Sequence, residues 1–301
     1  MDEIPLSRRA VLGSAVVGAA TLAACHGGLS RPATGIAPAI PTEPARRRMP
    51  TAFVGHGSPE TALHAPYGSL WTAWADAMPR PQAVLVFSAH FELRPITIGA
   101  TTTQPLVYDF YGFDDPLYAI RYATPGAPAL ADRVEGLLRP LGSVERMEDR
   151  GLDHGAWVPL KWMYPRADVP VLTVSIPTHD AAPLAKVGQA LAPLRDEGVL
   201  LLGSGNVTHN LRSLSDPARG TPAWASDFDA WTADVVTRGD LDALVDYLRR
   251  SPSPSRSHPT KDHFVPLIVS AAAGIHTGGA TTFPITGWEG GSISRRCIQI
   301  G

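Results

Sequence analysis

The sequence predicts an α/β protein, a single domain with a mostly parallel central sheet flanked by helices. Short apolar runs alternate along the chain with longer stretches whose apolar residues recur at helical spacing. The chain has 301 residues, of which 44% are hydrophobic and 18% charged, enough to bury a sizeable core. No Pro/Gly-rich linker divides residues 49–301. Strands that alternate with helices favour a parallel sheet covered on both faces.

The first elements follow this alternation. Residues 51–55 are a short apolar run that ends at glycine, which is typical of a buried strand. Residues 68–78 carry apolar side chains at helical spacing. Residues 83–89 form a continuous apolar run and residues 94–101 alternate in polarity, so two more strands are expected. Residues 127–138 place their large apolar side chains on one face and predict a helix.

The second half of the chain repeats the pattern. His154 opens a helix, residues 169–176 and 199–203 predict strands, and residues 183–195 predict the helix between these strands. The remaining expected elements are helices at 223–236, 240–249 and 264–273, a loop at 251–255, and strands at 280–286 and 292–300.

The first residues are expected to lie outside this domain. A twin arginine, Arg8-Arg9, precedes an uncharged stretch at 10–24, which is shorter than the roughly 20 residues that span a bilayer. This order is typical of a twin-arginine signal peptide, and Leu22-Ala23-Ala24-Cys25 is similar to a lipobox. The alternatives are an uncleaved anchor or a cytoplasmic tail. We expect a signal peptide at 1–24, a flexible tether at 25–48, a folded domain at 49–301, and an exported protein that is periplasmic or membrane-anchored through lipid on Cys25.

Composition excludes several classes of protein. A formal net charge of -2 argues against a nucleic-acid binder, which normally has a strongly basic face. Two cysteines cannot make a disulfide scaffold, and only Cys297 remains if Cys25 carries lipid. The glycines at 203–206 lack the lysine of a phosphate loop, and the absence of a Gly-x-Ser-x-Gly motif weakens an esterase interpretation.

Histidines follow several of the expected strands. His56 comes directly after residues 51–55, and His90 comes directly after residues 83–89. The carboxyl ends of parallel strands form the ligand crevice of an open α/β sheet. Because neutral imidazole is the commonest metal ligand, we expect His56 and His90 to bind a metal from adjacent strand ends.

Three further histidines occupy similar positions. His209 follows the strand at 199–203 through a glycine turn, His154 follows Asp153 in a second glycine-flanked turn, and His263 begins the helix at 264–273. Each one could instead be a hydrogen-bonded core residue. Asp153 is either a turn residue or an acceptor that orients an imidazole. The other histidines are expected at the surface: His64, His179, His258 and His276.

Six motifs together resemble the class III extradiol ring-cleavage dioxygenases, and more narrowly their 4,5-DOPA dioxygenase extradiol branch, which has the LigB-type fold. The resemblance extends from about residue 49 to the end of the chain. The motifs are Gly55-His56-Gly57-Ser58-Pro59, Ser88-Ala89-His90, Asp109-Phe110-Tyr111-Gly112-Phe113, Gly151-Leu152-Asp153-His154-Gly155-Ala156-Trp157, Gly205-Asn206-Val207-Thr208-His209-Asn210 and His263-Phe264-Val265-Pro266-Leu267.

The resemblance implies one divalent metal per chain, Fe(II) or Zn(II), a catechol substrate and dioxygen. His56, His90 and His263 match the family's ligand positions. His209 matches a fourth histidine that is attributed either to the metal or to acid/base work, and His154 matches an active-site histidine. His154 and His209 are therefore the acid/base candidates, because imidazole has a pKa near neutrality. Partners other than a small molecule, and nucleic acid in particular, are not expected.

Two interpretations from other classes remain open from the residues alone. A zinc-dependent hydrolase could use the same histidines to activate water. A non-catalytic binding protein could carry a vestigial site on the same scaffold. The sequence does not specify the catechol, the metal or the oligomeric state.

Overall fold

The computed structural model describes residues 48–301. The expected signal peptide at 1–24, Cys25 and all but the last residue of the expected tether lie outside the described residues. Within residues 48–301, no helix combines the length and the apolar character needed to cross a membrane.

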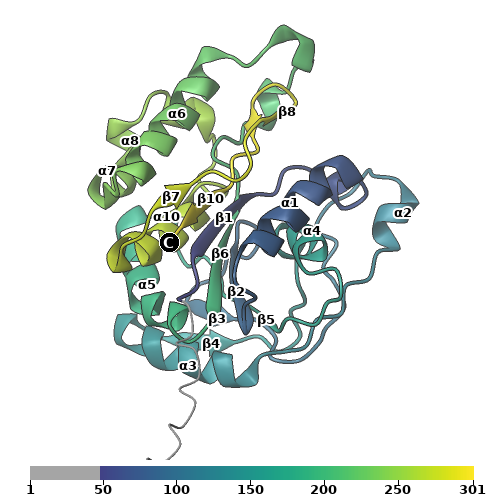
Figure 1. Ribbon diagram of the computed structural model, residues 1–301, viewed down its shortest axis with the longest axis vertical. Helices are drawn as coiled ribbons and strands as arrows, with labels where there is room; N and C mark the ends of the chain where they lie inside the picture. Colours follow the sequence, from purple (N-terminus) through teal and green to yellow (C-terminus); the bar gives the residue numbers. More distant parts are fainter. Residues whose placement is uncertain (1–47) are drawn as a thin grey trace, which may run out of the picture. The chain divides into compact units, whose positions relative to one another are not determined.

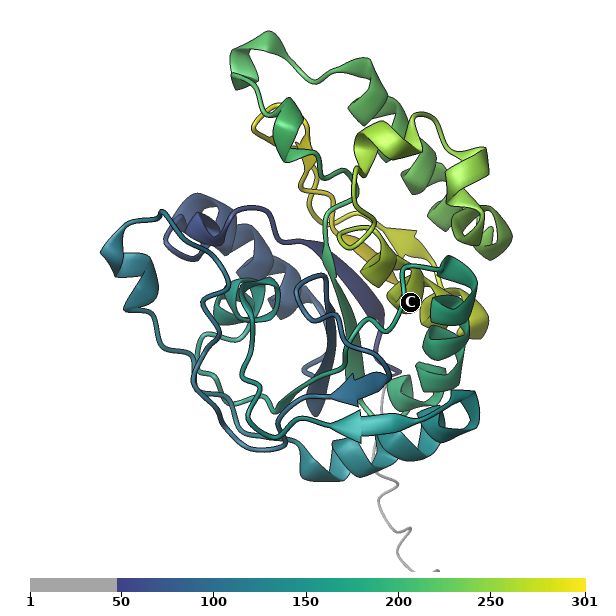
Figure 2. The same cartoon turned by 180° about the vertical axis from the view of Figure 1, so that it is seen from behind.

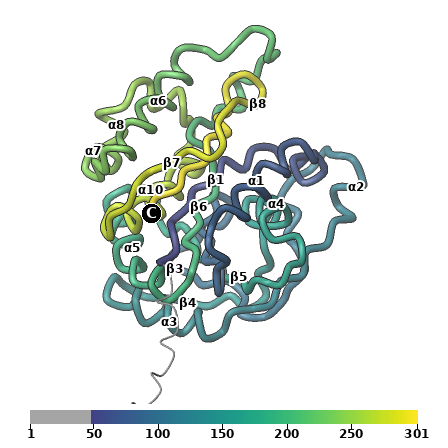
Figure 3. Tube along the Cα trace, viewed as in Figure 1, coloured from purple at the N-terminus to yellow at the C-terminus, as the bar shows by residue number. Residues whose placement is uncertain are grey.

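A six-stranded sheet forms the centre of the domain (Figure 1), with the strand order β5-β2-β6-β1-β10-β7. The first four strands in this order are mutually parallel: β5 (Val171–Thr173), β2 (Ala83–Ser88), β6 (Val199–Gly205) and β1 (Thr51–Gly55). At the other edge, β10 (Ile298–Ile300) pairs antiparallel with β1 and with β7 (Thr281–Thr282). Figure 3 shows that the C-terminal end of the chain returns to lie beside β1. The predicted α/β fold with a mostly parallel sheet is confirmed.

The strand order corrects one expectation. β1 and β2 are not neighbours, because β6 lies between them and pairs with both. His56 and His90 therefore do not follow adjacent strands. The two histidines nevertheless lie at the same end of the sheet, since β1, β6 and β2 are parallel.

Two small sheets lie outside the central one. β3 (Ile96–Ile98) pairs parallel with β4 (Val144–Arg146), so the strand expected at 94–101 is short and does not join the central sheet. β8 (Trp288–Glu289) pairs antiparallel with β9 (Ile293–Ser294). The strand expected at 292–300 divides into β9 and β10, and between them Arg295 and Arg296 form ion pairs with Glu289 and Asp229.

Helices cover both faces of the central sheet (Figure 2). α1 (Ala65–Ala77) and α4 (His154–Met163) pack on one face. α3 (Pro128–Leu138), α5 (Ala181–Leu191) and α10 (Val265–Thr277) pack on the other. The remaining helices of the described residues are short or peripheral: α2 (Asp115–Tyr118), α6 (Ala223–Thr237), α7 (Leu241–Val245), α8 (Tyr247–Arg250) and α9 (Pro254–Ser257).

Side chains of the buried strands alternate between the two cores. Val84 and Val86 of β2 pack with α1 and α4, whereas Leu85 and Phe87 pack with α5 and α10. This period of two is a property of extended backbone, and it explains why a continuous apolar run forms a strand with a helix on each side.

Glycines let β6 approach the start of α10. A Cβ on Gly205 would lie 2.0 Å from the His263 carbonyl oxygen, a contact that backbone must move to relieve. We expect Gly205→Ala to lower the free energy of unfolding by about 1–3 kcal/mol, as overpacking does. The measurement is urea denaturation followed by circular dichroism.

A matched glycine provides the control. Gly136 lies inside α3, and a Cβ there meets nothing within 4 Å. Gly136→Ala should raise the free energy of unfolding by about 0.5–1 kcal/mol, because alanine loses less backbone freedom in a helix. Equal effects of the two substitutions would contradict the close approach at Gly205.

Candidate metal centre

Five histidines line one pocket of about 530 Å³, a size usual for small-molecule sites. His56 follows β1, His90 follows β2 and His209 follows β6, so all three lie at the carboxyl ends of parallel strands. His154 begins α4, and His263 immediately precedes Phe264, the N-cap of α10. The structure thus brings together the five histidines that the sequence singled out.

The hydrogen-bond network assigns the tautomer of His56. Its Nδ1 lies 2.9 Å from Ser204 Oγ, and the Ser204 hydroxyl donates to the Gly155 carbonyl at 2.5 Å. Because the Ser204 proton is used, Ser204 Oγ accepts from His56 Nδ1–H. His56 Nε2 therefore carries a free lone pair that faces the pocket.

Asp109 lies between two other imidazoles. Its Oδ1 accepts from His154 Nδ1 at 2.9 Å and from the His154 backbone N–H at 3.0 Å, and its Oδ2 lies 3.3 Å from His90 Nδ1. Asp262 does the same for His263, whose Nδ1 lies 2.5 Å from Asp262 Oδ2. A carboxylate on Nδ1 leaves Nε2 as the lone-pair nitrogen, which is the usual arrangement behind metal-bound histidine.

Two of these nitrogens face each other. His90 Nε2 and His56 Nε2 are 3.3 Å apart. The contact is an N–H···N hydrogen bond when His90 carries its proton on Nε2, and both nitrogens are free to bind one cation when that proton is on Nδ1, beside Asp109. Two nitrogens bound to one metal at about 2.1 Å would be separated by about 3.0–3.4 Å, depending on the angle. The donor set fits a metal ion.

The ring spacing selects three histidines. The ring centroids are separated by 5.1 Å for His56–His90, 5.2 Å for His56–His263 and 4.9 Å for His90–His263. Rings bound to one metal through nitrogens at about 2.1 Å have centroids about 4.5–5.2 Å apart. This trio could hold one ion with open positions left for a substrate.

Each of the other two histidines lies closer than this spacing to one member of the trio. The centroid of His154 is 3.9 Å from that of His90 but 5.3 Å from that of His56, and His209 stacks on His263 at 3.5 Å with an angle of 7° between the rings. His154 also offers a nitrogen within 4.8 Å of those of His56 and His90. Both flanking rings touch the pocket, where each could exchange a proton with a bound molecule.

Electrostatics favour a bound cation. Burial, followed by the neighbouring imidazoles, lowers the pKa of both His56 and His90 well below the ordinary value. The same causes lower the pKa of His209 to about 2. Burial alone would raise the pKa of Asp109, but the hydrogen bond from His154 and the charges of His154 and His90 lower it to about 2. At neutral pH His56, His90 and His209 are therefore neutral, and Asp109 is ionised.

A second network supports the strand end that carries His90. Asp153 is the N-cap of α4: it accepts from Ala156 N–H and from Ser88 Oγ, and it pairs with Arg150. Arg150 also donates to the His90 carbonyl at 2.8 Å. Of the two interpretations of Asp153, the turn residue is correct, since Asp109 rather than Asp153 orients His154.

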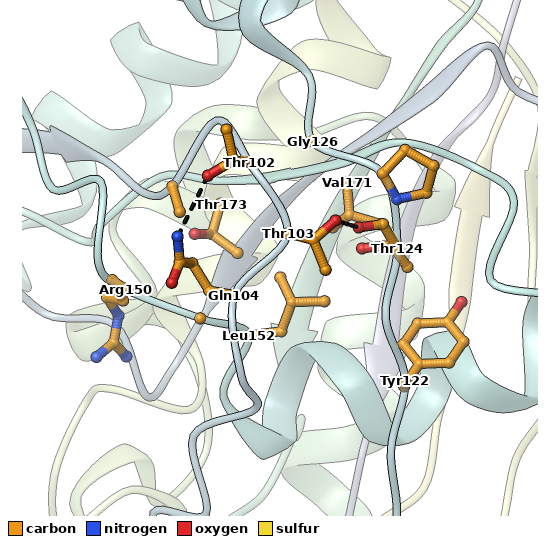
Figure 4. A pocket seen from close by; sticks show the side chains of 13 residues that line it. Thr102, Thr103, Gln104, Tyr122, Thr124, Gly126, Arg150, Leu152, Val171 and Thr173 are labelled. Carbon is orange, nitrogen blue, oxygen red and sulfur yellow. Dashed lines mark hydrogen bonds between the residues drawn. The ribbon is translucent and has the colours of Figure 1, made fainter.

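Arg150 also borders a small cavity (Figure 4), whose lining includes four threonines and Gln104, which donates to Thr102. Its volume is about 20 Å³, room for about one water molecule. The histidine pocket is therefore the one of the two with room for a substrate.

Several residues of the site are not predicted by the sequence patterns. Asp109 was noticed only as part of a motif, Asp262 adjoins His263, and Ser204 lies within a buried strand. The only available signal was their position next to a glycine, an aromatic residue or a histidine. The apolar wall was also missed, and it is formed by Phe110, Phe113, Leu211, Leu214 and Ile293.

His258 corrects another expectation. It is not at the surface: its exposed fraction is 4%, its Nε2 donates to the Val207 carbonyl at 2.7 Å, and its ring packs on Phe228 and Phe264. The neighbouring Pro and Ser residues suggested a loop, but tertiary packing covers the ring. His64 and His276 are exposed as expected, and His179 is half-buried beside Glu92.

Burial of His258 predicts acid sensitivity. Burial lowers the pKa of His258 to about 4, below the value of 6.5 in the unfolded chain. Between these values the unfolded state binds more protons, so the free energy of unfolding falls as pH drops from 6.5 toward 4. His258→Gln keeps a donor for Val207 but does not titrate in this window. We expect the fall to be smaller in the variant, by up to about 3 kcal/mol.

Urea denaturation at several pH values from 7 to 4 measures this difference. His276→Gln is the control, because His276 is exposed and should leave the pH dependence unchanged. Parallel pH profiles for wild type and His258→Gln would contradict the assignment.

Comparisons with known proteins agree with this geometry. The family model described as the catalytic LigB subunit of aromatic ring-opening dioxygenase matches residues 54–282. A protein of Beta vulgaris named 4,5-DOPA dioxygenase extradiol is 39% identical over 251 residues, which cover 81% of this chain and 93% of the relative. A protein of the same name from Escherichia coli (strain K12) is 40% identical over 261 residues, covering 84% and 95%.

A solved structure matches as well. The crystal structure of an uncharacterized protein from Escherichia coli K12 is similar with a TM-score of 0.70 and 35% sequence identity. The match covers 84% of this chain and all of the other, at 100%. The sequence comparisons thus identify the family, and the solved structure shares the fold.

Proposed function

We propose a substrate, a metal and residue roles for this chain, which belongs to the family of LigB-type catalytic subunits of aromatic ring-opening dioxygenases. As a member it is an extradiol dioxygenase, which inserts both atoms of O₂ into an aromatic ring beside a diol. The substrate is a catechol-type, DOPA-like aromatic. The observation that carries this proposal is a pocket that gathers five histidine rings and is lined beside them by apolar side chains.

The metal is one divalent ion per chain, Fe(II) or Zn(II), and His56, His90 and His263 would hold it. When bound, iron supplies the electron transfer that links a catechol to dioxygen, whereas zinc supplies Lewis acidity alone. The stacking of His209 on His263 supports an acid/base role for His209 over a fourth ligand position.

The chain's own groups orient the ring and move its proton. Five apolar side chains line the pocket, so a planar ring bound there would lie against apolar surface and be shielded from water: Phe110, Phe113, Leu211, Leu214 and Ile293. His154 Nδ1–H is held by Asp109, which leaves His154 Nε2 to accept the catechol proton. His209, which stacks on His263, is the second acid/base candidate.

Anaerobic reconstitution tests the proposal. Fe(II) is added to the full chain without oxygen, catechols are mixed in, and air is then admitted while oxygen uptake and the appearance of a yellow ring-opened product are followed. We expect both signals with Fe(II) and neither with Zn(II). Hydrolysis of esters by the zinc form without oxygen chemistry would support the hydrolase alternative, and ligand binding without turnover by either form would support a binding protein.

The cellular location is also proposed. Arg8-Arg9, the uncharged stretch at 10–24 and Leu22-Ala23-Ala24-Cys25 support export as a periplasmic or membrane-anchored lipoprotein. Intact-mass measurement on native material should find a chain that begins at Cys25 and carries acyl mass. A cytoplasmic product that retains residues 1–24 would overturn this.

A further inference from the structure

The charges that line the histidine pocket are all of one sign. Beyond the histidines and the apolar walls, the pocket is lined by Glu60 and Glu289. Among residues 48–301, no lysine or arginine lines it. Glu60 is exposed at the rim, on the short 3₁₀ turn Pro59–Ala62 that follows His56.

Arg295, a cationic side chain beside the pocket, already forms an ion pair. Arg295 has an exposed fraction of 4%, and its Nη2 lies 2.6 Å from Glu289 and donates to Thr61 Oγ1. The guanidinium also lies over the Tyr67 ring, with 4.2 Å between Cζ and the ring centroid. A substrate carboxylate would have to break the ion pair with Glu289 to reach Arg295.

Glu289 is itself fixed in place. Its two carboxylate oxygens accept from Ser58 N–H at 3.3 and 3.2 Å. Gly57 has a φ of +62°, and a Cβ there would lie 2.3 Å from Glu289 Oε2, so the loop after β1 accommodates this carboxylate closely. The Glu289–Arg295 pair is thus a neutral wall of the pocket, and Glu60 supplies an uncompensated negative charge.

The acidic character continues outside the pocket. A neighbouring hollow of about 310 Å³ shares Glu60 and Phe113 with the histidine pocket and adds Asp114. Leu63, Leu117 and the imidazole of His64 line the same hollow. A ring substituent that leaves the pocket on this side therefore meets apolar surface, one imidazole and two carboxylates.

We infer that this site selects catechols by the charge of the ring substituent, favouring a chain that bears an ammonium, with or without a carboxylate, or a neutral chain over a chain whose only charge is a carboxylate. The inference rests on the proposed ring-opening function and adds a substrate class to it. A substituent carboxylate would lose its hydration without gaining a cationic partner, and it would lie near the negative charge of Glu60. Both effects are unfavourable. A substituent ammonium gains the attraction of Glu60 and Asp114.

The expected preference is moderate, because Glu60 is exposed and screened by solvent. One screened charge pair near the protein surface is expected to give a ratio of about tenfold between ammonium and carboxylate substrates at low salt. The ratio should shrink as salt rises through the range where the Debye length falls below about 10 Å.

Three catechols with the same short chain provide the test: 4-(2-aminoethyl)catechol, 4-propylcatechol and 3-(3,4-dihydroxyphenyl)propanoate. Binding is measured by calorimetry to the zinc-loaded full chain without oxygen, and kcat/KM is measured on the iron-loaded chain in air. We expect the amine to bind and react best and the carboxylate worst. Equal values for the three, or a preference for the carboxylate, would overturn the inference.

Variants assign the effect to residues. Glu60→Gln should reduce the amine-to-carboxylate ratio by about threefold to tenfold. Glu289→Gln should release Arg295 and improve carboxylate binding. Glu145→Gln is the matched control: Glu145 is exposed on β4, does not line the pocket, and changes the net charge equally. A change in Glu145→Gln as large as in Glu60→Gln would overturn the local assignment.

The two proposals fail in different ways. If none of the three catechols is opened by the iron form, the proposed function fails, while the binding order without oxygen still tests the charge selection. If all three are opened at equal rates, the function stands and the inferred selectivity is wrong.

Discussion

Replacement of His56 by alanine is expected to remove most of the bound metal and leave the chain folded. His56 supplies one of three imidazoles at mutual ring distances of 4.9 to 5.2 Å. With this ring absent, two ligands remain, and affinity should fall by more than the roughly 10- to 100-fold that loss of a ligand's hydrogen-bond partner costs. The side chain lines the pocket, so its removal enlarges an existing cavity.

Metal per chain after reconstitution and dialysis measures the effect, and circular dichroism measures folding. His64→Ala is the control, because His64 is an exposed histidine before α1 that makes no side-chain capping hydrogen bond. We expect near-stoichiometric metal in the control and little in His56→Ala. Full metal content in a folded His56→Ala protein would remove His56 from the ligand set.

Apolar runs were sufficient to predict most of the sheet. The runs at 51–55, 83–89 and 199–203 coincide with β1, β2 and β6, since burial on both faces requires residues that are apolar without alternation. The order of strands was not predictable in this way. Insertion of β6 between β1 and β2 depends on contacts between residues distant in sequence, which no local pattern encodes.

The candidate site, like the fold, could be predicted from the sequence only in part. Five histidines were recognisable because strand ends and glycine turns are positions where side chains reach a crevice. Their hydrogen-bond partners were not, because Asp109 lies 45 residues from His154 and Ser204 lies 148 residues from His56. His258 shows the opposite error, since a residue in a polar stretch can still be covered by aromatic rings from other elements.

Asp109 links the metal trio to the proton-transferring group. One of its oxygens holds His154 and the other lies beside His90, so a single carboxylate orients two imidazoles. Asp109→Asn removes the negative charge and can no longer accept from both rings with both of its terminal atoms. We expect this variant to lose metal affinity by about 10- to 100-fold, as for other partners of metal-bound histidine, and to lose turnover as well.

The substitution His154→Phe separates metal binding from proton transfer. His90 keeps its contact with Asp109, and the three imidazoles of the metal trio are unchanged, so we expect the variant to retain metal. Loss of a positioned base typically costs about 10²- to 10⁴-fold in rate, and kcat should fall by that factor with little change in catechol binding measured without oxygen. His209→Phe should lose turnover too. The metal content of this variant decides between the two roles considered for His209, metal ligand and acid/base group. Because His154 also offers a nitrogen within 4.8 Å of His56 and His90, loss of metal from His154→Phe would make it a ligand, and wild-type turnover would exclude it from the mechanism.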